Sequence, residues 1–110
     1  MNFTVREQDG SNIVAFEGDV DLQSSPDARK ILLETVTKGK PVLIDLSKVN
    51  YIDSSGVASL VESFQSARKS GLNLVLVSVS EGALRVLQLA RLDKVFVICD
   101  TIEDGLAKAL

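Results

Sequence analysis

The sequence predicts an α/β fold with a mainly parallel sheet, an antiparallel N-terminal hairpin strand and helices packed on the sheet. Short apolar runs typical of buried strands alternate with segments of helical periodicity, in the order ββαβαβαβα. A turn sequence separates the first two strands, which predicts a hairpin. The chain has 110 residues, 45% of them hydrophobic and 25% charged, so we expect a single domain over residues 1–110.

The hairpin is expected over residues 2–17. Apolar and polar residues alternate over residues 3–7, the turn is Asp9-Gly10-Ser11-Asn12, and an apolar run, residues 13–16, gives the second strand. An acidic loop, residues 18–21, is expected to follow it.

The first helix is expected to begin at Ser25-Pro26-Asp27, because Ser can cap a helix and Pro suits its first turn. Gly39 ends this helix. Residues 41–46 are mostly apolar, which predicts a buried strand of a parallel sheet. Residues 47–52 are expected to link that strand to Asp53.

The second half of the chain continues the alternation. A helix is predicted over residues 54–70, followed by a buried strand over residues 72–77 and a helix capped by Ser80. A last strand over residues 95–98 precedes a helix capped by Thr101. The apolar face of the helix after Asp53 comprises Val57, Leu60, Val61, Phe64 and Ala67. Of these, Val57, Leu60 and Phe64 are expected to be core rather than interface.

Composition excludes several classes of function. The chain has no His and one Cys, which excludes an ordinary zinc site and a Ser-His-Asp or Cys-His catalytic centre. We expect neither an enzyme nor a bound metal or cofactor. The net charge of −3 and the absence of a basic stripe argue against nucleic-acid binding. No apolar run is long enough for a membrane span, and the single Cys99 cannot form an internal disulfide, which points to the cytoplasm.

The segment Asp53-Ser54-Ser55-Gly56 is the candidate functional site. It opens an amphipathic helix directly after a predicted strand and link, so Asp53 would cap the helix and Ser54 would lie exposed at its positive end. Gly56 would keep the surface low enough for a protein to approach closely. Taken alone, the tetrapeptide is no more than a helix cap.

Two further acids strengthen this interpretation. Asp19 and Asp21 follow the second strand, whereas Ser54 follows the next one. Loops at the carboxyl ends of neighbouring parallel strands share one edge of a sheet, so we expect these residues to lie near Ser54. Taken alone, Asp19 and Asp21 are better explained by turn formation and solvation.

Three segments then carry a family resemblance. The stretch from Val42 to Val57, with Asp53-Ser54-Ser55-Gly56 near its end, resembles the signature of STAS domains, and more narrowly of stand-alone bacterial anti-sigma factor antagonists. The segments at residues 18–22 and 83–92 resemble two further motifs of the family. The resemblance extends over essentially the whole chain.

The resemblance implies a partner switch in transcription regulation. It implies that the unphosphorylated protein binds an anti-sigma factor that is also a serine kinase, and is released on phosphorylation at Ser54. It also implies a metal-dependent serine phosphatase that resets the switch. By similarity, Asp21, and less firmly Asp19, belong to the partner contact surface, together with Asp53, Ser54, Ser55 and Gly56.

Two other functions compete with the phosphorylation switch. STAS domains also serve as cytoplasmic subunits of lipid-transporting ABC complexes, or as other docking modules without phosphorylation, but the acidic pair beside a clear Asp-Ser-Ser-Gly favours the switch. A nucleotide-binding protein would need a glycine-rich phosphate loop, and neither Gly-x-x-x-x-Gly-Lys-Ser/Thr nor Gly-x-Gly-x-x-Gly occurs in the chain.

Overall fold

Five strands form one mixed sheet in the order β1-β2-β3-β4-β5, in which β1 is antiparallel to β2 and all other neighbours are parallel. The computed structural model describes residues 1–110. The predicted order of elements and the N-terminal hairpin are confirmed. The strands are β1 (Asn2–Gln8), β2 (Ser11–Val20), β3 (Val42–Ile52), β4 (Leu74–Val77) and β5 (Val97–Cys99). The helices are α1 (Ser25–Val36), α2 (Ser54–Lys69), α3 (Glu81–Leu89) and α4 (Ile102–Ala109), with a short 3₁₀ helix, η1 (Leu92–Lys94).

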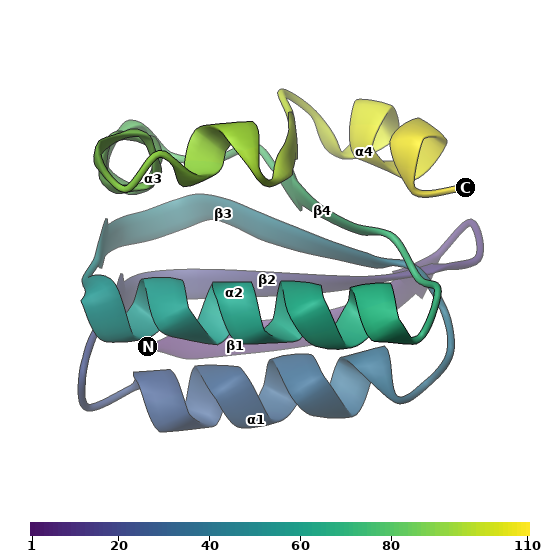
Figure 1. Ribbon diagram of the computed structural model, residues 1–110, viewed down its shortest axis with the longest axis horizontal. Coiled ribbons are helices and arrows are strands. Elements are labelled where there is room, and N and C mark those ends of the chain that lie inside the picture. The colour runs from purple at the N-terminus through teal and green to yellow at the C-terminus, as the bar shows by residue number, and fades with distance from the viewer.

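The helices cover the two faces of the sheet unequally. Side chains alternate along a strand, so Ile44 packs in the larger apolar cluster with α1, α2 and α3, whereas its neighbour Leu43 packs against α4 in a smaller one. Figure 1 shows α1 and α2 side by side along the sheet. An ion pair between Arg29 and Glu62, with 2.6 Å between Nε and Oε2, joins these two helices.

The apolar face predicted for α2 belongs to the core. Val57, Leu60 and Ala67 are buried in the larger cluster, and Val61 and Phe64 pack against it while partly exposed. The predicted capping residues of the last two helices are also confirmed. Ser80 Oγ accepts from the N–H of Ala83 at 3.2 Å, and Thr101 Oγ1 accepts from Asp104 at 3.1 Å.

Two predicted connections are strand rather than loop or link. The prediction of an acidic loop over residues 18–21 is wrong for Gly18, Asp19 and Val20, because these residues continue β2. The predicted link over residues 47–52 is also wrong, because it forms the second half of β3. The β2–β3 register shifts after Ala15 and again after Gly18. Pairing continues beyond each shift and ends with Val20 opposite Ile52. Cross-strand pairing extends both strands through polar residues that carry no strand signal of their own.

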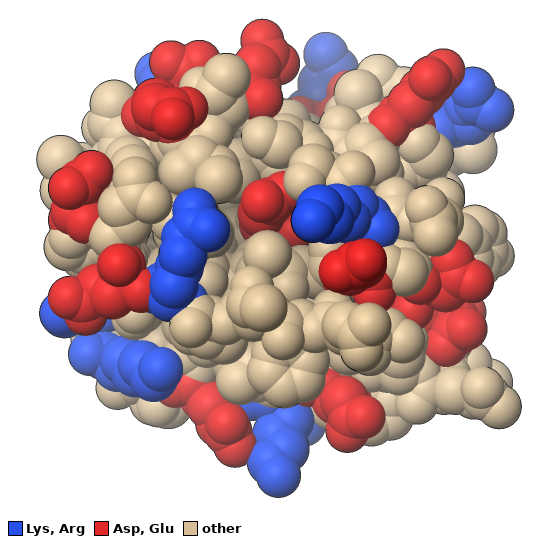
Figure 2. Space-filling view, turned by 180° about the vertical axis from the view of Figure 1, so that it is seen from behind, with Lys and Arg blue, Asp and Glu red and all other residues tan.

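The far side of the molecule carries charges of both signs. Figure 2 shows Lys and Arg side chains interspersed with Asp and Glu over the face seen from behind Figure 1. No field of a single sign dominates this view. None of the helices combines the length and the apolar composition that a membrane-spanning segment requires.

Candidate functional site

Asp53 builds the N-terminus of α2. Its Oδ1 atom accepts hydrogen bonds of 3.0 Å from the backbone N–H groups of Ser55 and Gly56, and one of 2.6 Å from the Ser55 hydroxyl. These bonds satisfy two N–H groups that have no partner within the helix. Asp53 is therefore the predicted helix cap, and its carboxylate is fixed at the entrance of the segment.

The two serines of the segment differ in what they can do. The Ser55 hydroxyl is half-buried and donates to Asp53, which ties it to the cap. Ser54 is exposed, at the first helical position, and its hydroxyl has no hydrogen-bond partner within the chain. Ser54 is thus exposed at the start of the helix, as the sequence predicts.

Gly56 is required by a close approach between α2 and the sheet. A Cβ atom at this position would lie 2.5 Å from the Val20 carbonyl oxygen and 2.7 Å from Cγ1 of Ile52. The sequence predicts that Gly56 keeps the surface low for an approaching protein, but this is wrong, because the residue is buried and faces the end of β2. Its absent side chain lets the helix begin directly against β2, which brings Ser54 to the edge of the sheet.

Asp21 organises the turn between β2 and α1. Its Oδ1 atom accepts from the backbone N–H groups of Gln23 and Ser24 and from the Ser24 hydroxyl, each at 3.1 Å. The Ser24 hydroxyl also contacts the Asp19 carbonyl oxygen at 3.0 Å. The predicted cap residue Ser25 is instead the buried first residue of α1, and Asp21 with Ser24 shapes the turn that leads into it.

The structure brings the Asp21 turn and the Ser54 segment together. The backbone N–H of Leu22 donates to Oδ2 of Asp53 at 3.0 Å, and the backbone N–H of Asp53 donates to the carbonyl oxygen of Val20 at 3.2 Å. The sequence predicted that Asp19 and Asp21 lie near this segment. Asp21 is next to Leu22 in this arrangement, and Asp19 is exposed in β2, paired in register with Tyr51.

Both carboxylates at this edge are ionised at neutral pH. The hydrogen bond from the Ser55 hydroxyl, followed by those from backbone N–H groups, holds the pKa of Asp53 below its ordinary value. The backbone N–H of Ser24, and then its hydroxyl, lowers the pKa of Asp21, although repulsion from Asp53 opposes this shift. The Ser54 hydroxyl therefore lies at an edge that already carries two fixed negative charges.

Two residues of the site were not predicted from the sequence. Ser24 bonds to Asp21 through both its backbone N–H and its hydroxyl, and Leu22 links the two segments through its backbone N–H. The spacing Asp21-x-x-Ser24 before Pro26 is a signal for the first of these, since Asp and Ser commonly close such turns. The backbone bond of Leu22 leaves no signal in the sequence, because any residue except Pro can make it.

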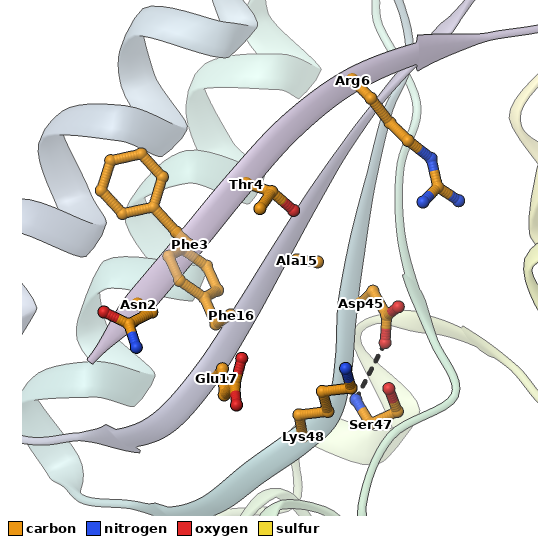
Figure 3. Close-up of a pocket in the computed structure, with 10 residues that line it drawn as sticks. All are labelled: Asn2, Phe3, Thr4, Arg6, Ala15, Phe16, Glu17, Asp45, Ser47 and Lys48. Carbon is orange, nitrogen blue, oxygen red and sulfur yellow. Dashed lines mark hydrogen bonds between the residues drawn. The ribbon is translucent and has the colours of Figure 1, made fainter.

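A separate hollow lies on the open face of β1, β2 and β3. It has a volume of about 210 Å³ and includes Thr4, Arg6, Ala15 and Asp45 in its lining. Figure 3 shows these side chains around the small Ala15, with Asp45 accepting from the backbone N–H of Ser47 at 2.9 Å. None of the predicted site residues lines this hollow. No group of three or more His, Cys, Asp or Glu side chains is placed to hold a metal ion.

Known proteins resemble the chain along nearly its whole length. It is 29% identical over 105 residues to the anti-sigma-B factor antagonist of Bacillus subtilis, an alignment that covers 96% of each chain. A crystal structure of an anti-sigma factor antagonist from Mycobacterium paratuberculosis superposes with a TM-score of 0.89 at 26% identity, covering 98% of this chain and 92% of that one.

A third relative shares the fold at lower identity. An anti-sigma-factor antagonist (STAS) domain protein from Planctomyces limnophilus superposes with a TM-score of 0.87 at 21% identity, covering 97% of each chain. The family model of the STAS domain matches residues 2–105. The chain belongs to the STAS domain family.

Proposed function

We propose that this chain is an anti-sigma factor antagonist, a binding protein of a cytoplasmic partner switch rather than an enzyme. Its unphosphorylated form binds an anti-sigma factor that is also a serine kinase, and phosphorylation at Ser54 releases it. A metal-dependent serine phosphatase resets the switch. The names of full-length relatives support the antagonist role. The observation that carries the site is the free, exposed hydroxyl of Ser54 beside the fixed carboxylate of Asp53.

The partner contact surface comprises the residues around that hydroxyl. Asp53 and Ser55 hold the start of α2, Gly56 sets it against β2, and Asp21 shapes the neighbouring turn. Asp19 is exposed on the same edge. Asp53, Ser55 and Gly56 mainly position Ser54. Asp19 and Asp21 contact the partner directly.

The geometry supports release through local charge. A phosphate adds about −1.5 to −2 charges at neutral pH. The backbone N–H groups of Ser55 and Gly56 already bind Asp53, so a phosphate on Ser54 must share this helix end with an ionised carboxylate. It therefore points outward, into the space that the partner occupies in the complex.

The nucleotide bound to the kinase supplies the negative charge that repels the phosphate on Ser54. A hydroxyl that receives a phosphoryl group faces the phosphates of the bound nucleotide, so the product phosphoserine faces the anionic nucleotide left behind. Like charges brought together at an interface cost several kcal/mol, and 1.4 kcal/mol already weakens binding about tenfold. Release requires no refolding of the antagonist.

The experiment is phosphorylation of purified wild-type, Ser54→Ala and Ser55→Ala proteins by anti-sigma factor serine kinases of the source organism. Ser55 is the matched control, because it is the neighbouring hydroxyl on the same helix end. We expect one phosphate in the wild type and in Ser55→Ala, and none in Ser54→Ala, by intact-protein mass spectrometry. Equal incorporation in Ser54→Ala would overturn the assignment.

A further inference from the structure

Two large apolar side chains are exposed at the edge that carries Ser54. Leu22 is 74% exposed and Tyr51 is 52% exposed. Leu22 follows the end of β2, and Tyr51 lies near the end of β3, where the register pairs Val20 with Ile52. Exposed apolar residues are common on protein surfaces, but these two lie on the adjoining ends of the two strands that lead into the candidate site.

The backbone of each residue is held in place. The N–H of Leu22 is bonded to the Asp53 carboxylate, and the preceding Asp21 is tied into its own turn. Tyr51 is paired in the sheet with Asp19, and the next residue, Ile52, is buried. Because these backbones are already ordered, covering the two side chains costs less conformational entropy than ordering a mobile loop would.

The charges around these side chains indicate the chemistry of what covers them. Asp19 pairs with Tyr51 in register, and the carboxylates of Asp21 and Asp53 flank Leu22. None of these three carboxylates takes part in a salt bridge within the chain, since the ion pairs of the structure use Glu62, Glu7 and Glu81. The edge is therefore apolar at two points, each with a carboxylate beside it that has no salt-bridge partner within the chain.

We propose that Leu22 and Tyr51 are the apolar anchors of the partner contact, and that the serine-kinase partner covers them with an apolar pocket rimmed by Lys or Arg side chains. The inference rests on the proposed function, because it describes the surface that meets the same partner. Aromatic residues near the centre of an interface commonly carry much of its binding energy. The basic rim pairs with the aspartates, while Ser54 faces the nucleotide.

The test measures calorimetric affinity between the unphosphorylated protein and the source-organism kinase that phosphorylates wild-type Ser54. The variants are Leu22→Ala, Leu22→Gln, Tyr51→Ala and Tyr51→Phe. Leu110→Ala is the matched control for Leu22, since Leu110 is 84% exposed but lies at the opposite edge of the sheet. Leu110 follows Ala109, whose carbonyl oxygen accepts a hydrogen bond from Asn73 just before the start of β4. Leu22 and Tyr51, by contrast, lie at the carboxyl ends of β2 and β3.

We expect Leu22→Ala, Leu22→Gln and Tyr51→Ala each to weaken binding about tenfold or more, and Tyr51→Phe and Leu110→Ala to bind within about twofold of wild type. Unchanged melting temperatures would show that the variants fold. Leu22→Gln keeps side-chain bulk should Leu22→Ala be unstable, and Tyr51→Phe shows whether the ring without its hydroxyl is sufficient for binding. Near-wild-type binding of Tyr51→Ala, or of both Leu22 variants, would overturn the inference while leaving the proposed function intact. If no kinase modifies or binds the wild type, the proposed function fails, and this inference fails with it.

Discussion

The backbone N–H of Leu22 donates a hydrogen bond of 3.0 Å to Oδ2 of Asp53, which lies 31 positions later in the chain. The other oxygen of the same carboxylate caps α2. One side chain therefore joins the turn after β2 to the helix after β3, and it sets the position of Ser54 relative to Asp21. Perturbing this carboxylate should affect the fold and the switch together.

Replacing Asp53 should test that connection. Asp53→Ala removes the acceptor for the N–H groups of Leu22, Ser55 and Gly56, and we expect the melting temperature to fall by about 5 °C. Thermal unfolding followed by circular dichroism measures this change. Asp27→Ala is the control, because Asp27 is an exposed acid in the first turn of α1. A loss no larger than that of Asp27→Ala would contradict the central role given to Asp53.

Gly56→Ala offers a test in which two effects have opposite signs. Helix propensity alone predicts that the substitution stabilises a helix by about 1 kcal/mol. The Cβ atom would, however, meet the Val20 carbonyl oxygen at 2.5 Å, and the backbone of β2 cannot easily move away. We expect a net destabilisation of about 1–3 kcal/mol by urea unfolding, typical of overpacking. A more stable variant would show that α2 does not approach β2 as described.

Acid should selectively remove the stabilisation supplied by Asp53. Its folded pKa lies below the ordinary value of 3.8, so the folded state binds fewer protons than the unfolded state as the pH passes through this range. The stabilisation is fully present above that value and is lost as the pH falls through the folded pKa. Urea unfolding of wild type and Asp53→Asn should show a stability gap at pH 7 that narrows at pH values below about 3.8. A gap independent of pH would mean that the charge of Asp53 contributes nothing.

Partner binding should depend on salt through the exposed acids. Asp19 is exposed, and its carboxylate forms no salt bridge within the chain. Raising the ionic strength should weaken binding of the unphosphorylated protein to its kinase, because salt screens exposed charges. Asp19→Asn should bind more weakly at low salt and respond less to added salt, with Asp9→Asn, at the hairpin turn, as a control. Identical salt dependence in Asp19→Asn and wild type would exclude Asp19 from the contact.

Most of the fold could be predicted because its local signals agree with its tertiary contacts. Buried runs such as the first part of β3 and the apolar face of α2 have the expected periodicity, and Ser80 and Thr101 cap the helices that they precede. The ends of β2 and β3 could not be predicted. Their polar residues are held in strands by pairing with each other across the sheet, which is a long-range effect.

The sequence names candidate residues for the site, whereas the contacts between them come only from the structure. A serine after a capping Asp, together with acids at the end of the neighbouring strand and in the turn after it, identifies Ser54, Asp19 and Asp21 as candidates. The link through Leu22 and the burial of Gly56 against Val20 depend on how two distant segments pack. Neither can be derived from periodicity or motif spacing, because the Leu22 N–H and the Val20 carbonyl are backbone groups that leave no mark on the choice of residue.

The most direct measurement compares two calorimetric titrations of the kinase, one with the unphosphorylated protein and one with protein carrying a single phosphate on Ser54. Both titrations should be made with bound nucleoside diphosphate, and phosphate placement should be verified by peptide mass spectrometry. We expect the phosphorylated protein to bind at least about tenfold more weakly, a difference of about 1.4 kcal/mol or more. Equal affinity of the two forms would contradict a switch that acts through charge at Ser54.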